Sequence, residues 1–293
     1  MRKDTMTSDM IRSLTLKVLV DDQTRKADVL AEHGLSFWIE ADCCRILFDT
    51  GEGQALRHNV RQLGLNLAEV DAVAISHGHY DHTGGLDLAL SECTKAAFFM
   101  HPDALRARYS RSADGGARSI GFPLQAGELL RTRLESFRWT RTVTSLRSSV
   151  FLTGEITRRA ASTPSGGRFF LDPDCRVPDP FLDDQALGVE TEQGMIVLLG
   201  CSHAGVESTL KCALSHSLSK RLRAVIGGMH LAGASEDELA RLVDYLEELG
   251  PDLISPCHCS GAEAKEYLKS RFPAAYEEAG AGTELTFSQR RNE

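Results

Sequence analysis

Alternating apolar and polar positions predict two groups of strands along this chain. In the first group, short runs with an apolar residue at every second position are bounded by Asp, Gly or Thr. The second group begins near residue 148 and includes a hairpin with Glu192-Gln193-Gly194 as its turn. The predicted strands span residues 14–20, 35–40, 45–48, 71–75, 96–100, 150–153, 168–171, 186–191, 195–199, 223–226, 252–255 and 283–287.

Helical spacing of apolar residues follows the strands of each group. Leu56, Val60 and Leu63 share one face of a helix predicted for residues 53–63, which Gly64 ends. Other helices are predicted for residues 86–91, 206–217, 235–249 and 262–270. Because each sheet must bury both faces, this order predicts an α/β fold, a four-layer αββα sandwich. We expect a single domain over residues 1–293.

One region interrupts the regular pattern. Residues 106–118 are rich in Gly, Ser and Arg and predict an inserted loop, within a variable insert around residues 102–147. The paired glycines at 115 and 116 would suit a lid over a site. Phe137 and Trp139 would suit an interface, which leaves a homo-oligomer open.

Composition and charge narrow the classes of partner. The chain has 293 residues, 42% of them hydrophobic, and a net charge of −8, which argues against a basic face for nucleic acid or anionic membranes. Its apolar runs fall far short of the roughly 20 residues that cross a bilayer. No apolar segment follows Met1–Asp9, and the eight cysteines lack the spacing of a small secreted domain. We therefore expect a cytoplasmic protein with a small-molecule substrate.

The segment Ser76-His77-Gly78-His79-Tyr80-Asp81-His82 gathers three imidazoles and a carboxylate at the end of a predicted strand. Residues two apart in an extended loop point the same way, so His77 and His79 can share one ion. Asp81 and His82, on the turning backbone, can face a second position. Nitrogen and oxygen ligands of this kind suit zinc, iron or manganese, which predicts a catalytic metal site.

This segment resembles the His-x-His-x-Asp-His motif of the metallo-β-lactamase superfamily. Phe48-Asp49-Thr50-Gly51 before it and Thr83-Gly84-Gly85-Leu86 after it extend the resemblance. The segments at residues 32–36, 183–187, 200–205, 227–231 and 256–261 are similar to one subgroup, named for 7,8-dihydropterin-6-methyl-4-(β-D-ribofuranosyl)aminobenzene-5′-phosphate synthase.

The resemblance implies two divalent metal ions, with zinc expected and manganese or iron as alternatives. The ligands that it implies are His77, His79, Asp81, His82, His203 and His258. The general pattern of the superfamily also has a histidine before the late hairpin and an aspartate at its end, where this chain has Asp183-Asp184 and Cys201. Asp184 or Cys201 could therefore complete the ligand set, and His203 would then contact the substrate as an acid. A thiolate ligand would favour zinc over manganese.

The same resemblance implies a hydrolase in which hydroxide held between two ions attacks a small phosphoester, or a cyclic ester or amide. We assign catalytic roles to Asp81, His203 and His230, with either histidine protonating the leaving group. His230 also fits a polar core position. An alternative is a pterin-type transferase, for which a phosphate cradle could come from Arg106, Arg108, Arg111 and Arg118. A metal-binding sensor without turnover is a third reading.

Other polar residues near the motif have plainer interpretations. Asp49 at a strand end is expected to orient a ligating imidazole rather than to bind metal. Glu32 and His33 are expected to be exposed to solvent in a loop. The remaining histidines, His58, His101 and His216, are expected at the surface or at helix caps.

Overall fold

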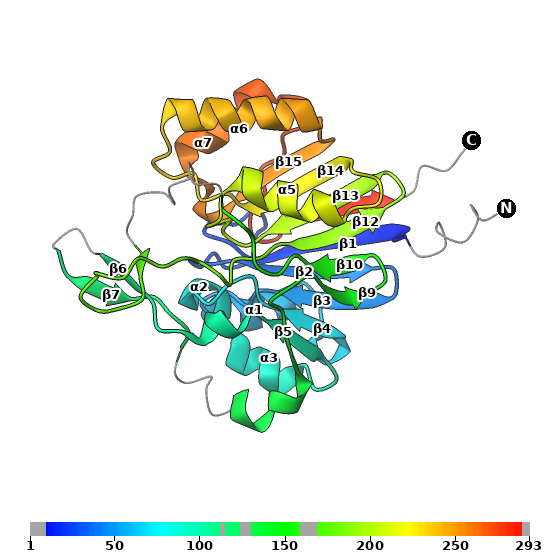
Figure 1. Ribbon diagram of the computed structural model, residues 1–293. Helices are drawn as coiled ribbons and strands as arrows, with labels where there is room; N and C mark the ends of the chain where they lie inside the picture. Colours follow the sequence, from blue (N-terminus) through cyan, green and yellow to red (C-terminus); the bar gives the residue numbers. More distant parts are fainter. Residues whose placement is uncertain (1–9, 112–114, 124–129, 159–168, 289–293) are drawn as a thin grey trace.

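Two β-sheets pack face to face in a computed structural model of the chain, which describes residues 10–111, 115–123, 130–158 and 169–288 (Figure 1). Residues 1–9 and 168, which belong to two of the sequence predictions, lie outside these ranges. The first sheet has the strand order β16-β1-β2-β3-β4-β5-β8. Its strands are β1 (Ser13–Val20), β2 (Ser36–Ala41), β3 (Cys44–Phe48), β4 (Ala72–Ala74), β5 (Ala97–Met100), β8 (Phe137–Trp139) and β16 (Glu284–Ser288).

The second sheet has the order β15-β14-β13-β12-β10-β9. Its strands are β9 (Thr144–Arg147), β10 (Val150–Leu152), β12 (Leu187–Thr191), β13 (Gly194–Leu199), β14 (Leu222–Gly228) and β15 (Leu253–Cys257). All six residues of β13 are buried. Ile196 and Leu198 face the core between the sheets, whereas Met195 and Val197 face the helices outside, as the two-residue period of a strand requires.

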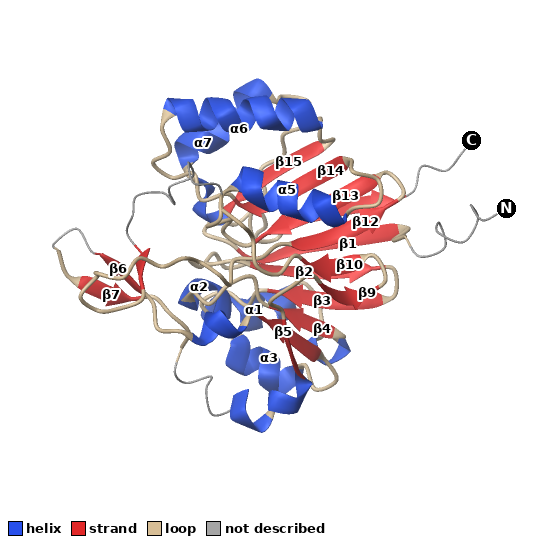
Figure 2. Cartoon of the chain, viewed as in Figure 1, coloured by secondary structure: helices blue, strands red, loops and turns tan. Residues whose placement is uncertain are grey.

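Helices cover the outer face of each sheet (Figure 2). The first sheet packs on α1 (Gln54–Gln62) and α3 (Leu86–Glu92), and the second on α5 (Val206–His216), α6 (Glu236–Leu249) and α7 (Ala262–Arg271). Ser235 and Glu238 form a capping box at the start of α6, and Gly250 ends it in the left-handed conformation. The predicted αββα sandwich is confirmed. No helix of the described ranges is long and apolar enough to cross a bilayer.

The insert is more ordered than the sequence predicts. Residues 106–118 are predicted to form an inserted loop, but β6 (Tyr109–Arg111) and β7 (Ala117–Ser119) pair antiparallel there. They form a third sheet with β11 (Phe169–Phe170), in the order β11-β6-β7, which projects from the side of the sandwich (Figure 1). The whole of β7 is exposed, so no apolar alternation could reveal it.

Strands β8 and β9 were also not predicted from the sequence. Phe137 in β8 is buried, and its ring centroid lies 5.2 Å from that of Phe98 in β5. The apolar character of Phe137 therefore reflects core packing and gives no support to the interface alternative. Trp139 remains 43% exposed.

The topology brings six strand ends to one edge of the sandwich. Strands β3, β4 and β5 run parallel in the first sheet, and β13, β14 and β15 run parallel in the second. Ligands commonly bind outside the carboxyl ends of parallel strands. The motif at residues 76–82 follows β4, and residues 200–205, 229–231 and 258–261 follow the three strands of the second sheet.

Candidate metal centre

Three imidazoles from two sheets meet at this edge. Nε2 of His77 lies 3.1 Å from Nδ1 of His79 and 3.3 Å from Nε2 of His203. Both motif histidines follow β4, whereas His203 follows β13. Burial, the largest cause, holds the pKa of each of these histidines well below its usual value. The imidazoles are therefore neutral, which is the form that binds metal.

A second set of possible ligands lies beside the first. Oδ2 of Asp81 lies 3.7 Å from Nε2 of His82 and 3.3 Å from Nε2 of His258. Asp81 and His82 belong to the one-turn helix α2 (Tyr80–Thr83), and His258 begins a 3₁₀ helix after β15. Burial raises the pKa of Asp81, but the imidazoles of His82 and His258 outweigh it and hold that pKa well below its usual range. The carboxylate is thus ionised.

Of the two alternatives for a further ligand, the structure brings Cys201 to the imidazoles. Its Sγ lies 3.1 Å from Nε2 of His82, and the two form a possible metal-binding group with His77. Asp184 instead accepts a hydrogen bond from the backbone N–H of Ala204 and belongs to none of the possible metal-binding groups in the described ranges. Burial raises the pKa of Asp184 to about 7. Asp184 therefore supports the loop that carries His203.

Buried polar residues hold the motif from behind. Oδ2 of Asp49 accepts a hydrogen bond from Nδ1 of His82 at 2.8 Å, the role expected of this aspartate. Its other oxygen accepts the backbone N–H of Ser76 at 2.7 Å. Asp183 accepts a hydrogen bond from the backbone N–H of Gly78 and forms an ion pair with the buried Arg108. The turn is therefore fixed through the backbone N–H groups of Ser76 and Gly78, on either side of His77.

Strained backbone also marks the strand ends. The φ values of Asp49, His230 and His258 are 63°, 48° and 47°. They lie in the left-handed region, which residues other than Gly rarely adopt. Such conformations persist only where the surrounding structure enforces them, and they cluster at functional sites. For His258, the backbone N–H donates to buried Asp21 and Nδ1 donates to Asp22 at 2.7 Å.

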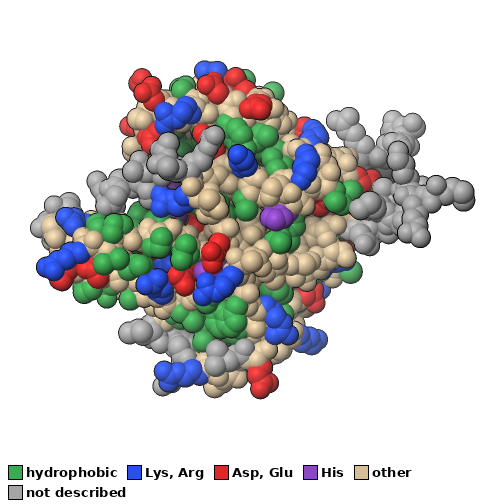
Figure 3. Space-filling view, in the orientation of Figure 1, with side chains coloured by type: hydrophobic (Ala, Val, Ile, Leu, Met, Phe, Trp, Pro, Cys, Tyr) green, Lys and Arg blue, Asp and Glu red, His purple; other side chains and the backbone are tan. Residues whose placement is uncertain are grey.

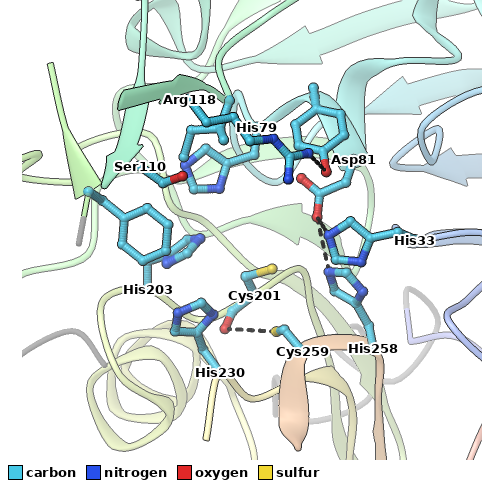
Figure 4. A pocket seen from close by; sticks show the side chains of 13 residues that line it. His33, His79, Asp81, Ser110, Arg118, Cys201, His203, His230, His258 and Cys259 are labelled. Atoms are coloured by element: carbon cyan, nitrogen blue, oxygen red, sulfur yellow. Dashed lines mark hydrogen bonds and ion pairs between the residues drawn. The ribbon is translucent and has the colours of Figure 1, made fainter. Parts of the chain in front are cut away.

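Four members of the two sets, namely His79, His203, Asp81 and His258, line a cavity of about 200 Å3, which Figure 4 shows from close by. His230 faces this cavity, with its ring centroid 4.4 Å from that of His203, so the structure places it at the pocket rather than in the core. Burial lowers the pKa of His230, but Cys259 and Asp184 more than offset it and raise that pKa. The full lining is His33, His79, Tyr80, Asp81, Ser110, Arg118, Ile120, Phe169, Cys201, His203, His230, His258 and Cys259.

Two residues that line the cavity, His33 and Cys259, were not predicted to belong to the site. His33, expected in solvent, is 52% exposed, yet its Nε2 lies 3.4 Å from Oδ2 of Asp81. Cys259 belongs to a possible metal-binding group with Cys201 and His230, although the sequence had favoured no role for it. The segment Cys257-His258-Cys259 was the available signal, since it places a thiol next to the expected ligand His258 after the end of β15.

Several other sequence expectations are decided by packing. Glu32 accepts hydrogen bonds from the backbone N–H groups of Gly53, Gln54 and Ala55, and so caps α1 rather than hanging in solvent. His101 caps a 3₁₀ helix, as predicted, but is buried and not at the surface. His216 is exposed on α5.

The four arginines proposed as a phosphate cradle do not act together. Arg108 is buried between Asp179 and Asp183, and Arg111 binds the carbonyl of Cys175 and lies over the ring of Phe170. Arg106 pairs with Asp103. Of the four, Arg118 alone lines the cavity, which contradicts a cradle built from all of them.

The donor geometry fits metal ions. Four ligands at the usual zinc–nitrogen bond length of about 2.0–2.1 Å form a tetrahedron with edges of about 3.3 Å. The nitrogen separations of 3.1 and 3.3 Å around His77 match such edges. Nε2 of His258 is buried, faces Asp81 and has no hydrogen-bond partner among the described residues. A cation between the side chains would satisfy it.

The two packed sheets and the cluster of possible metal ligands at their edge are typical of the metallohydrolase fold. Comparison with known families agrees with this class. The family described as the metallo-beta-lactamase superfamily matches residues 30–206, so the chain belongs to that superfamily.

Individual relatives narrow the comparison. The chain is 31% identical over 274 residues to the 7,8-dihydropterin-6-methyl-4-(beta-D-ribofuranosyl)-aminobenzene-5′-phosphate synthase of Methanocaldococcus jannaschii, covering 88% of this chain and 90% of the relative. Among solved structures, it is similar to Tm1679, described as a metal-dependent hydrolase of the beta-lactamase superfamily. That match has 32% identity and a TM-score of 0.79, and covers 94% of this chain and 100% of the other. YhfI from Bacillus subtilis, at 12% identity and a TM-score of 0.56, shares the fold; the match covers 94% of this chain and 100% of YhfI.

Proposed function

We propose that this protein is a metal-dependent hydrolase that acts on a small phosphoester, or on a cyclic ester or amide. The observation that carries the proposal is that two sets of three possible ligands lie side by side, namely His77, His79 and His203, and Asp81, His82 and His258, and that each set contributes two of its members to the wall of one cavity. Similarity to the metal-dependent hydrolase Tm1679 supports it.

Each set would hold one divalent ion, with zinc the expected element because Cys201 would add a sulfur donor beside His82. The chemistry supplied by metal ions bound at these residues would be the activation of water to hydroxide near neutral pH. The side chains of the protein would bind the ions and hold the ligand imidazoles in a fixed orientation. Asp49 holds the ring of His82 in one tautomer, and the neutral imidazoles of His77, His79 and His203 offer free nitrogens.

His230 is proposed as the proton donor to the leaving group. It lines the cavity beside His203, and Cys259 and Asp184 raise its pKa, which favours the protonated form near neutral pH. His203 serves as a ligand in this scheme, since its Nε2 faces His77. Asp81 contributes an ionised carboxylate at the same cavity.

A transferase is the second candidate, favoured by 31% identity to the M. jannaschii synthase over most of both chains. Its name implies that a pterin and a ribofuranosylaminobenzene phosphate are joined. The same site could serve such a reaction, because stabilising the charge of a departing diphosphate requires the same cationic surroundings as ester hydrolysis.

Turnover assays on protein loaded with zinc separate the two candidates. A hydrolase is expected to cleave bis(4-nitrophenyl) phosphate or a lactone without a second substrate. A transferase is expected to release diphosphate from a pterin alcohol diphosphate only when the ribosylaminobenzene phosphate is present. His230→Ala is expected to lower kcat and keep the metal content, and His216→Ala on the exposed face of α5 is the control. Absence of both activities in protein that holds two ions would refute the proposal.

A further inference from the structure

The small third sheet carries one row of three side chains across its strands. Ser110 in β6 is the register partner of Phe169 in β11 on one side and of Arg118 in β7 on the other. Directly opposed residues of neighbouring strands project from the same face of a sheet. All three line the cavity, so the row forms a wall of the pocket (Figure 4).

The aromatic end of the row lies against the imidazoles. The ring centroid of Phe169 is 5.5 Å from that of His79, 5.4 Å from that of His203 and 5.6 Å from that of His230. Phe169 is partly exposed and lines the cavity, although its ring also packs on that of Phe181 at 5.5 Å. A planar group entering the cavity would meet this ring.

The cationic end of the row lies at Tyr80. Arg118 donates a hydrogen bond to the hydroxyl of Tyr80, and its guanidinium lies over that ring, 5.0 Å from the centroid. The backbone N–H of Tyr80 donates to the carbonyl of Ile120 at 3.0 Å, which ties the end of the hairpin to the metal motif. Tyr80 stands between His79 and Asp81 in sequence, so the charge of Arg118 is held next to the centre.

We propose that this row is a recognition site for an organic phosphate with a planar ring. Arg118 and the hydroxyl of Ser110 bind the phosphate, and the face of Phe169 packs against the ring. The guanidinium donates two parallel hydrogen bonds to phosphate oxygens, which a lysine cannot reproduce. The site deepens the proposed function by naming its substrate class, and it rests on that function only for the location of the reacting group.

The neighbouring arginines of the insert support this choice. Arg108 is committed to two buried carboxylates, and Arg111 projects from the alternate position of β6, where it lies over Phe170. Arg118 is exposed at the cavity. Figure 3 shows acidic and basic side chains interspersed on the face drawn there, so a local site rather than a broad basic surface must attract an anion.

Calorimetric titration of the metal-loaded protein tests the row with three probes. Phenylphosphonate has both ring and anion and cannot be hydrolysed, methylphosphonate lacks the ring, and benzyl alcohol lacks the anion. Arg118→Ala is expected to weaken phenylphosphonate binding about 10- to 100-fold, because it removes a charge-assisted hydrogen bond to the anion. Phe169→Leu is expected to weaken phenylphosphonate binding and leave that of methylphosphonate unchanged.

Arg106→Ala removes the same charge from the same insert and is the matched control, with affinity expected to equal that of the wild type. Unchanged phenylphosphonate affinity in Arg118→Ala would overturn the proposal, and so would an equal loss in Arg106→Ala, which indicates general charge attraction. Arg118→Lys, expected to recover only part of the affinity, tests the fork geometry if the alanine variant fails to fold. Because binding is measured without turnover, absent hydrolysis would refute the proposed function and not this site.

Discussion

Oδ2 of Asp49 lies 2.8 Å from Nδ1 of His82, and both side chains are completely buried. The same oxygen accepts a hydrogen bond from the hydroxyl of Ser76, and the other oxygen accepts the Ser76 backbone N–H. A histidine whose Nδ1–H is held by a carboxylate presents Nε2 in a fixed direction. In this chain that direction is towards Cys201 and Asp81.

Asp49→Asn should therefore weaken metal binding at the second set of ligands. The amide keeps the volume of the side chain but cannot accept with the strength of a carboxylate, so the imidazole loses its fixed orientation. Loss of such a partner typically costs about 10- to 100-fold in metal affinity. Competition with a chromogenic chelator measures it. Asp71→Asn, an exposed residue that accepts the N–H of Arg45, is the control; equal affinities in all three proteins would argue against the role.

Asp81→Ala should lower the metal content from about two ions per chain towards one. The substitution removes the only carboxylate of the second set and leaves the three imidazoles around His77 intact. Elemental analysis of purified protein measures the ratio. Asp87→Ala, on the exposed face of α3, should retain two ions. One ion or none in the wild type would exclude the dinuclear arrangement and favour the sensor reading.

Cys201→Ser should change the preference for metals. Its Sγ lies 3.1 Å from Nε2 of His82, so a thiolate there would favour zinc and cobalt over manganese. Cobalt-substituted wild-type protein is expected to show a thiolate-to-cobalt charge-transfer band in the near ultraviolet, and the variant to lose it. The exposed Cys43→Ser variant should keep the band. A band that persists without Cys201 would assign the thiolate to another cysteine.

Arg108→Ala should destabilise the fold by about 3–5 kcal/mol, since it leaves two buried carboxylates without their cation. Arg108 lies 2.7 Å from Asp179 and 2.6 Å from Asp183, and Asp183 also holds the backbone of Gly78. Urea unfolding measures the free energy. Arg106→Ala, which breaks an exposed pair with Asp103, should cost no more than about 1 kcal/mol. Similar losses in the two variants would show that burial of the ion pairs is unimportant.

Local chemistry was predicted more fully than the site as a whole. The strands and helices of the sandwich repeat at two and about 3.6 residues, so their apolar positions reveal them without a structure. The exposed strand β7 and the short strands β8 and β9 have no such period. His77 and His79 could be paired from spacing, because two residues along an extended backbone point the same way. Their separation of 3.1 Å agrees with that reasoning.

The sequence by itself determined the sandwich, the family resemblance and the gathering of possible metal ligands at residues 77–82, because each depends on residues close together in the chain. The tertiary structure decided what distant segments bring to that motif. It sets His203 against His77 across 126 residues and Asp22 against His258 across 236. It also brought Cys201, and not Asp184, beside the imidazoles of the motif, buried Arg108 and turned Arg118 to the cavity. Those outcomes depend on how the strand ends and the inserted sheet pack against one another. The apolar periodicity of each segment gives no information on such contacts between distant segments.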